Sequence, residues 1–175
     1  MAVKHQQSTS ITNRQATIVV PNPTGAGAGG KLINVSDSVV LAASQDAAST
    51  VRILRVPTNA KVKQVILVSQ AQTQGTFDLG VYYPTDGPTG KADLLANTII
   101  SDFFAQDIDL TSAYGPTDVT SQSTQYTIDL WNKPLWQALA LASDPGGEFD
   151  IVLSVVTTAV TTGLGIVGLS VNYVE

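Results

Sequence analysis

The chain has 175 residues, an apolar fraction of 43%, a charged fraction of only 13% and a formal net charge of −5. A chain of this length is typical of one domain that buries a core without covalent cross-links. The absence of cysteine excludes disulfides, thiolate catalysis and cysteine-based zinc or iron–sulfur sites.

Charge is unevenly distributed along the chain. Residues 1–65 carry seven Lys and Arg against two acids, a net charge of +5, whereas 66–175 carry two Lys against twelve acids, a net charge of −10. One hypothesis is that the N-terminal part contacts an acidic partner, or an acidic patch on a neighbouring copy. The alternative, which the weakness of exposed charges favours, is that the nine cations are scattered over a solvated surface.

We predict a flexible arm and a glycine-rich segment over residues 1–30, and a β-sandwich domain over 31–175. Residues 1–14 are polar without a period, and PNPTGAGAGG (21–30) has too few apolar side chains to order itself. A phosphate-binding loop would need a following Lys-Ser/Thr and a helix, which this segment lacks. The first residues have no apolar core of a secretory signal, and no run approaches the ~20 apolar residues of a membrane span. We therefore expect no membrane partner.

The next strands are short and end at turn signals. KLINVSDSVVL (31–41) is read as a β run interrupted by its Ser-Asp-Ser. TVRILRVP (50–57) and KVKQVILVSQ (61–70) flank the turn signal PTNA, so we predict that they form a hairpin. GTFDLGVYY (75–83) alternates cleanly between two faces, which predicts a half-buried strand.

The middle of the chain is ambiguous. Residues 91–110 fit either a helix followed by a strand or two short irregular elements. We read 111–125 as a loop and YTIDLW (126–131) as a short strand.

Residues 132–155 predict a helix, an acidic turn and a strand. Asn132 caps a helix of about two turns, which Pro145 and the following glycines end. In the strand that follows, Glu148 and Asp150 are predicted to solvate the outer face. A last strand, 165–175, repeats the alternation. We expect the structural anchors of this corner to be Pro134, Trp136, Leu139 and Phe149.

These elements add up to about eight strands, one or two short helices and many Gly, Pro, Ser and Thr turns. The prediction is an all-β protein, an antiparallel β-sandwich of which a jelly roll is one form. A βαβ pattern is absent, which argues against a doubly wound fold.

Chemistry-bearing motifs are scarce. The single histidine, His5, lies in the arm and supports neither a catalytic triad nor a zinc site. The acids around residues 107–109 and 144–150 do not match a calcium-binding loop. Calcium bound at the turn 144–150 and a catalytic pair of acids like that of a glycosidase remain alternative hypotheses. Sugar stacking on Trp131 also stays open. A pI of about 4.6 without a basic stripe argues against nucleic acid. We expect a non-enzyme without a cofactor.

Several blocks carry a resemblance to a known class of proteins. They are SITNRQAT, RILRVPTNAKVKQVIL, FDLGVYYP, DFF and KPLWQALALASDPGGEFDIVLSV, which together span most of 10–174. The chain resembles small structural proteins of tailed bacteriophages, in particular capsid decoration (cement) proteins. The glycine-rich segment at 25–30 is longer than in that pattern.

The resemblance implies a protein that binds the outside of a capsid and bridges its subunits. The implied partners are the major capsid protein and other copies of the chain, as a dimer or trimer, on the outer surface of a virion made in the host cytoplasm. The arm residues expected to contact the partner are Lys4, Arg14, Gln15 and Lys31. The alternative is a glycan- or receptor-binding component of a phage tail or head fibre, which would present an exposed aromatic platform near Trp131, Tyr82 or Tyr114.

Overall fold

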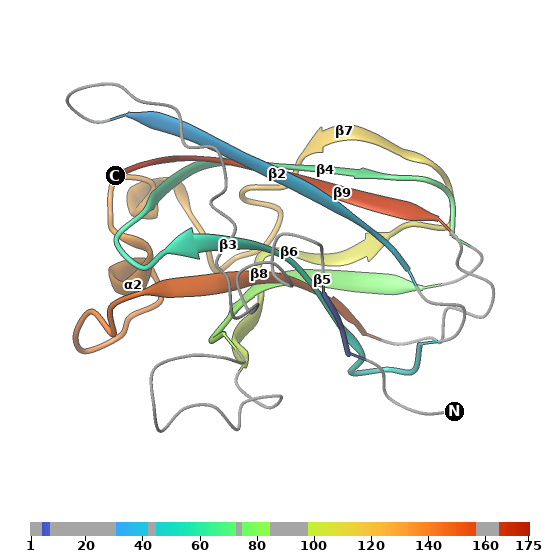
Figure 1. Ribbon diagram of the computed structural model, residues 1–175, viewed down its shortest axis with the longest axis horizontal. Helices are drawn as coiled ribbons and strands as arrows, with labels where there is room; N and C mark the ends of the chain where they lie inside the picture. Colours follow the sequence, from blue (N-terminus) through green and yellow to red (C-terminus); the bar gives the residue numbers. More distant parts are fainter. Residues whose placement is uncertain (1–4, 8–30, 42–44, 73–74, 85–97, 157–164) are drawn as a thin grey trace, which may run out of the picture.

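The structure is a computed structural model that describes residues 5–7, 31–41, 45–72, 75–84, 98–156 and 165–175. Nine strands in these residues form two sheets, which Figure 1 shows as two stacked layers. The predicted all-β sandwich is confirmed. None of the described helices is long and apolar enough to cross a membrane.

The larger sheet has five strands in the order β1-β3-β8-β5-β6. Its strands are β1 (His5–Gln7), β3 (Thr50–Pro57), β8 (Glu148–Val155), β5 (Thr76–Tyr82) and β6 (Thr98–Asp109). All pairs are antiparallel except β1 with β3, which is parallel. Within the segment assigned to the arm, β1 is therefore an edge strand of the sandwich, and the rest of 1–30 lies outside the described residues.

The smaller sheet has four antiparallel strands in the order β2-β9-β4-β7. They are β2 (Leu32–Val40), β9 (Ile166–Val174), β4 (Lys61–Ser69) and β7 (Tyr114–Asp118). The Ser-Asp-Ser of β2 does not interrupt the strand, because all nine residues keep register with β9. The segment 111–125, predicted as a loop, contains β7.

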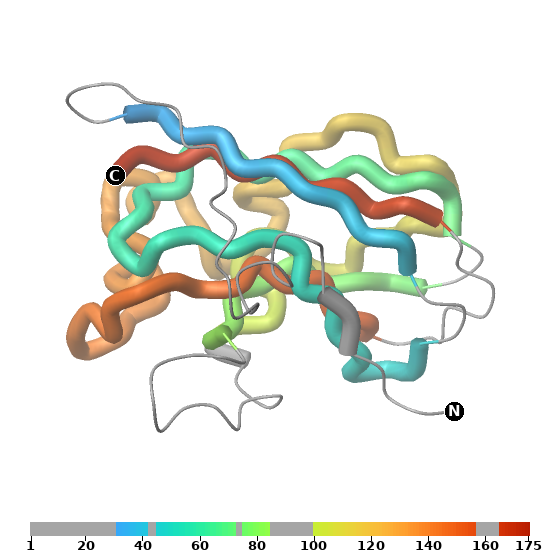
Figure 2. Tube along the Cα trace, in the orientation of Figure 1, coloured from blue at the N-terminus to red at the C-terminus, as the bar shows by residue number. Residues whose placement is uncertain are grey.

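The predicted hairpin of 50–57 and 61–70 is wrong, because β3 and β4 belong to different sheets. The turn between them carries the chain from one layer to the other, as the tube in Figure 2 shows. Turn residues at 57–60 indicate a reversal of direction, but they do not indicate whether the second strand pairs with the first.

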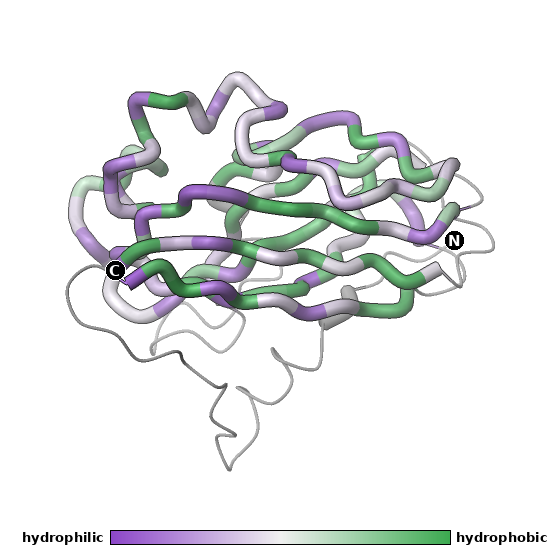
Figure 3. Tube along the Cα trace, turned by 90° about the horizontal axis from the view of Figure 1, so that it is seen from above, coloured by the Kyte–Doolittle hydropathy of each residue, from purple (hydrophilic) through white to green (hydrophobic). Residues whose placement is uncertain are grey.

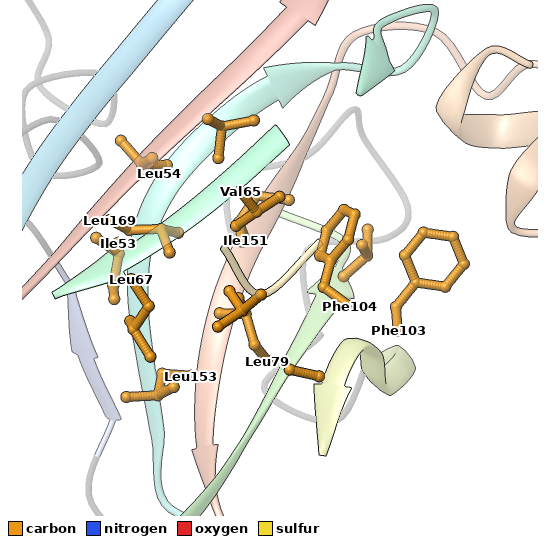
Figure 4. Close-up of a cluster of buried hydrophobic side chains, with 14 of the residues drawn as sticks. Ile53, Leu54, Val65, Leu67, Leu79, Phe103, Phe104, Ile151, Leu153 and Leu169 are labelled. Carbon is orange, nitrogen blue, oxygen red and sulfur yellow. The ribbon is translucent and has the colours of Figure 1, made fainter. Parts of the chain in front are cut away.

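The core lies between the two layers and takes side chains from both (Figure 4). The expected inward rows of β8 and β9 are buried, and hydropathy varies along the strands in Figure 3 as alternation requires. The inward rows consist of Phe149, Ile151, Leu153, Val155, Val167, Leu169, Val171 and Tyr173.

β6 is one long irregular strand rather than a helix followed by a strand. Leu79 pairs with Ala105 and Val81 with Ile100, so two positions of β5 span five of β6. This bulge turns both Phe103 and Phe104 into the core, where neither is exposed. Their rings pack on each other and on Tyr126 with centroids 5.0–5.2 Å apart.

One end of the sandwich is closed by the segment 119–147. Its helical parts are a 3₁₀ turn, η1 (Ile128–Leu130), in place of the strand predicted at 126–131, and the one-turn helix α2 (Leu135–Ala138). The first N–H groups of α2 donate to the turn between β3 and β4, from Leu135 N to Ala60 O (2.8 Å) and from Trp136 N to Thr58 O (3.0 Å).

The helix ends earlier than Pro145. Ala140 adopts a left-handed conformation with φ of 55°, and the N–H groups of Ala140 and Leu141 donate back to Gln137 O and Trp136 O. This pair of bonds is a Schellman motif, in which Ala140 takes the place usually held by glycine.

Candidate functional site

A buried ion cluster joins β3 to β8. Asp150 is fully buried, and its two carboxylate oxygens accept hydrogen bonds of 2.6 Å from Arg52 Nη1 and from Arg55 Nε. The prediction that Asp150 solvates the outer face of a strand is therefore wrong. The view that all nine cations are scattered over a solvated surface is also wrong, because Arg52 and Arg55 are only 2% and 5% exposed.

A β-bulge in β3 makes this cluster possible. In a regular strand, residues 52 and 55 point to opposite faces, because their separation is odd. The register between β3 and β8 shifts between Arg52 and Leu54, which places one extra residue there. Both guanidinium groups thereby reach the same carboxylate.

Arg52 also ties the cluster to the end of β5. Its Nη1 donates to the main-chain oxygen of Tyr83 (2.9 Å), and its guanidinium carbon lies 5.7 Å from the centre of the Tyr82 ring. With both carboxylate oxygens occupied and water excluded, the arrangement holds strands together and offers no reacting group to a substrate.

The aromatic side chains do not form an exposed platform. All eleven lie in described residues, and none is in the exposed class. Tyr82 is 3% exposed, while Tyr114 and Trp131 are half-buried and pack against the core. The three positions at which a glycan-binding surface was expected are therefore occupied in packing.

Of the four residues expected to anchor this corner, two lie in the core and two lie at its edge. Leu139 and Phe149 are buried, whereas Pro134 and Trp136 are half-buried. Leu135, which has 1% exposure, is the side chain of α2 that lies deepest, and Trp136 covers the core from outside. Of the expected arm residues, Lys31 is half-exposed just before β2, and Lys4, Arg14 and Gln15 lie outside the described residues.

The outer face of the smaller sheet carries a hydrogen-bonded row of side chains, here called the amide row. Asn34 Nδ2 donates to Asn172 Oδ1 (2.7 Å), Asn172 Nδ2 to Gln64 Oε1 (3.0 Å), and Gln64 Nε2 to Asp118 Oδ2 (3.0 Å). The row crosses all four strands, β2, β9, β4 and β7, because Asn34, Asn172 and Gln64 are neighbours in register.

Asp118 ends the amide row and is held by further donors. Its Oδ1 accepts hydrogen bonds from the N–H (3.0 Å) and the hydroxyl of Thr120, whose Oγ1 in turn accepts from Val65 N–H (2.7 Å). Partial burial alone would raise the pKa of Asp118, but the hydrogen bonds from Thr120 and Gln64 outweigh it and lower that pKa.

A shallow groove lies beside the amide row on the same face. It has a volume of about 360 Å³ and is lined by the acidic Asp37 and by small or aliphatic residues that include Ser36, Ser38, Ile66 and Val68. A Cβ on Gly168 would meet no atom closer than 3.8 Å, so the glycine leaves the groove open without being required by the backbone.

Acidic side chains gather where β5 meets β6. Asp78 Oδ1 accepts the N–H of Asp107 (2.9 Å), which has a left-handed φ of 53°. Burial raises the pKa of Asp78, and repulsion from the carboxylates of Asp102 and Asp107 raises it further. The hydrogen bond from the backbone N–H of Asp107 lowers the pKa, but by less, so the net shift is upward. Within the described residues, no group of three or more His, Asp or Glu is placed to hold a metal ion.

No protein-family model matches the chain, and no curated protein matches it in sequence. Two solved structures match the chain in a comparison of structures. The chain is similar in fold to a chain of the capsid of Ralstonia phage GP4. That likeness has a TM-score of 0.62 at 19% identity and covers 98% of this chain and 97% of the other.

The second structure is the capsid asymmetric unit of cyanophage Pam1, with a TM-score of 0.48 at 18% identity over 91% of this chain and 94% of the other. At such identities the likeness to the GP4 capsid chain shows the fold. The matched region covers nearly the whole length of both chains, so this fold makes up nearly all of the GP4 chain.

Sequence reasoning missed the amide row and the ion cluster. The alternation of β9 places Asn172 outward, but its partners Asn34 and Gln64 are 138 and 108 residues away in sequence. For the cluster, an available signal was an Asp near the start of the apolar run FDIVLSV together with two Arg in VRILRVP, since buried acids require partners.

Proposed function

We propose that this chain is a structural protein of a phage virion that binds the outside of the capsid and stabilises it by bridging capsid subunits. The observation that carries the proposal is the end-to-end likeness in fold to a chain of the GP4 phage capsid. The interior supports a structural rather than a catalytic role, because its one buried acid among the described residues is saturated by two arginines.

We further infer that the sandwich is a jelly roll. The eight strands from β2 to β9 form the orders β2-β9-β4-β7 and β3-β8-β5-β6. All sequence-adjacent pairs lie in opposite sheets except β5 and β6, which are neighbours. Two four-stranded sheets connected in this way correspond to the two Greek keys of a jelly roll.

The outer face of the smaller sheet suits adhesion to another protein. The amide row fixes Asn34, Asn172 and Gln64 through hydrogen bonds between side chains. Groups that are already ordered lose little conformational entropy on binding, so a rigid polar face is suited to contact with a partner. Many weak contacts of this kind on a capsid lattice would add through avidity.

The proposed partners are the major capsid protein and further copies of this chain. The positively charged arm residues Lys4, Arg14 and Lys31 provide charge that an acidic partner surface would attract. On a virion assembled in the host cytoplasm, the proposed location is the outer capsid surface.

The test is the copy number of the chain in purified particles, measured by quantitative mass spectrometry. A decoration protein is expected in hundreds of copies, in near-constant ratio to the major capsid protein. A handful of copies would favour the alternative, a glycan- or receptor-binding part of a tail or fibre, and absence from particles would overturn both.

A second measurement tests the outer position. Intact particles are treated with a protease, and the release of peptides from this chain is compared with that from the major capsid protein. Cleavage of this chain in sealed particles is expected, whereas protection until the particles are opened would place it inside.

A further inference from the structure

Gly168 lies inside β9, which is an inner strand of the smaller sheet between β2 and β4. Glycine weakens a strand, because its backbone loses more freedom on folding and it has no side chain to pack. Where a glycine does occur inside a strand, the reasons are a left-handed φ, a β-bulge, or the close approach of another group. The surroundings of Gly168 decide between these reasons.

Two of the three reasons do not apply to Gly168. Its φ lies outside the left-handed range. Its pairing is regular on both sides, with Ser38 of β2 and Val68 of β4 opposite it and no register shift at either pair. A Cβ at this position would meet no atom closer than 3.8 Å, so no neighbour occupies the space of a side chain. The remaining reason is the approach of a group from another molecule.

The shallow groove on the outer face has Gly168 at its centre and walls of different chemistry. β4 contributes the aliphatic side chains of Ile66 and Val68 to the lining, and β2 contributes the hydroxyl groups of Ser36 and Ser38. Val68 is 41% exposed, so its apolar surface is accessible to a partner. The groove therefore offers apolar contact along one side and hydrogen bonds along the other.

Charge is scarce around this groove. Of the eight residues that line it, Asp37 alone is charged, and its Oδ1 accepts the N–H of Ser38 (2.8 Å). Ile166, two residues before Gly168 on the same face of β9, is aliphatic and 43% exposed. Few charges and exposed apolar area are the composition found at the core of a protein–protein interface. This composition favours a protein as the molecule that covers the groove.

The two walls fit an aromatic side chain that carries a polar group. A glycine in a sheet leaves a gap that an aromatic ring fills. The face of the ring packs on aliphatic groups, whereas the hydroxyl of a tyrosine or the N–H of a tryptophan needs a hydrogen-bond partner. Ile66 and Val68 supply the first contact, and the hydroxyls of β2 supply the second. Tyrosine and tryptophan are also enriched among the residues that anchor an interface from within a pocket.

We propose that the groove over Gly168 is the docking site for a tyrosine or tryptophan side chain of the capsid partner. A side chain at position 168 would occupy the same space as the ring, which explains a glycine that the backbone does not require. The amide row beside the groove gives this contact an ordered polar border. The inference rests on the proposed function for the source of the aromatic side chain, and on the groove alone for its chemistry.

The first test fills the groove from its floor. Gly168→Val adds an outward side chain that has room and favours a strand, so the thermal unfolding midpoint should not fall. Binding to capsid shells that lack this chain is expected to be at least about tenfold weaker than for the unmodified chain. Gly115→Val is the matched control, because Gly115 lies in β7 of the same sheet, outside the groove, with no atom within 4 Å of an added Cβ. This control should bind like the unmodified chain.

The proposed function and the groove inference fail in different ways. Shells that do not bind the unmodified chain would overturn the proposed function and, with it, the capsid as the source of the aromatic side chain. Shells that bind Gly168→Val as tightly as the unmodified chain would overturn the groove inference alone. Equal weakening by Gly168→Val and Gly115→Val would also overturn only the groove inference.

The second test examines the chemistry of the groove without a capsid. The isotope-labelled chain is titrated with N-acetyltyrosinamide and, as the aliphatic counterpart, with N-acetylleucinamide at millimolar concentrations. The ring of the tyrosine amide is expected to shift the backbone N–H signals of Ser38, Val68 and Gly168 in NMR spectra, and the leucine amide to leave them nearly unchanged. In Gly168→Val, the shifts at Ser38 and Val68 should disappear. Equal shifts from the two amides, or no shift at these residues, would overturn the assignment of an aromatic occupant.

Discussion

Arg52 Nη1 donates to Asp150 Oδ2 at 2.6 Å, although the two residues are 98 positions apart and neither side chain is more than 2% exposed. Removing one partner of a buried ion pair leaves the other charge without compensation. We expect Asp150→Asn, which keeps the shape but removes the charge, to lower the free energy of unfolding by about 3–5 kcal/mol in urea denaturation.

Asp144→Asn is the control for this prediction. Asp144 is exposed, and its Oδ1 accepts the N–H of Gly146 (2.8 Å), which an asparagine can also do. A change within about 0.5 kcal/mol is expected. Equal losses for the two variants would show that the ion cluster contributes no special stability.

Asp78 should destabilise the fold at neutral pH. Its pKa is raised in the folded chain, first by burial and then by repulsion from Asp102 and Asp107, so the folded state binds the proton more tightly than the unfolded chain. The resulting stabilisation is complete below the unfolded value near ~3.9 and is lost as the pH rises through the folded pKa. Asp78→Asn keeps an acceptor for Asp107 N–H and is expected to be more stable than the native chain at pH 7, but not at pH 3. Thermal unfolding at both pH values measures this, and a variant that is less stable at pH 7 would contradict it.

Asp118 should show the opposite dependence. Burial raises its pKa, but the donors Thr120 and Gln64 lower it by more, so its contribution to stability is present above the unfolded pKa and is lost as the pH falls through the folded value. Thr120→Val removes a hydroxyl donor and is expected to raise the pKa of Asp118 more than Gln64→Leu does. A carboxyl NMR titration gives both values, and the reverse order would assign the main role to Gln64.

Gly80 is required by the bulge in β6. A Cβ at this position would lie 2.2 Å from both Ile100 O and Ser101 O, which are backbone atoms and cannot move without displacing Phe103 and Phe104. We expect Gly80→Ala to lower the free energy of unfolding by several kcal/mol, in the range of severe core changes. Gly168→Ala, whose Cβ would meet nothing closer than 3.8 Å, is the control and should leave stability nearly unchanged.

The helix that closes the sandwich should depend more on Leu135 than on Trp136. Leu135 is 1% exposed, so truncation to Ala is expected to cost about 2–5 kcal/mol. Trp136 is half-buried, so Trp136→Ala is expected to cost less than Leu135→Ala, although tryptophan is the larger side chain. Chemical denaturation of the two variants compares them directly, and a larger loss at Trp136 would restore it as the main anchor.

Period-two alternation predicted the strands that have one apolar row. In β9, Val167, Leu169, Val171 and Tyr173 are buried as the pattern required, and the same holds for the inward row of β8. The pattern failed where a polar residue is buried by a distant partner. Asp150 looks like a solvated position because Arg52 and Arg55 belong to another strand, and a bulge that no local pattern reveals brings them together.

Irregular pairing explains the other failures. Gly115 and Pro116 indicate a loop, but they occur here in an edge strand, where a missing N–H is tolerated. Residues 98–109 lose their period because the bulge turns consecutive phenylalanines inward. Whether β3 and β4 pair depends on which sheet each joins, and their sequences are consistent with either arrangement.

The strand order also determines when the molecule can fold. β9 lies between β2 and β4, and β8 lies between β3 and β5, so the strand that fills the middle of each sheet comes from the last 28 residues, 148–175. Until the ribosome has released these residues, β2 cannot reach β4 and β3 cannot reach β5. Neither sheet can therefore be completed before β8 and β9 are present, and contacts this distant in sequence form slowly. A nascent or truncated chain that lacks β8 and β9 would expose the four strand edges that these strands cover, so their pairing is the step that protects the chain from aggregation.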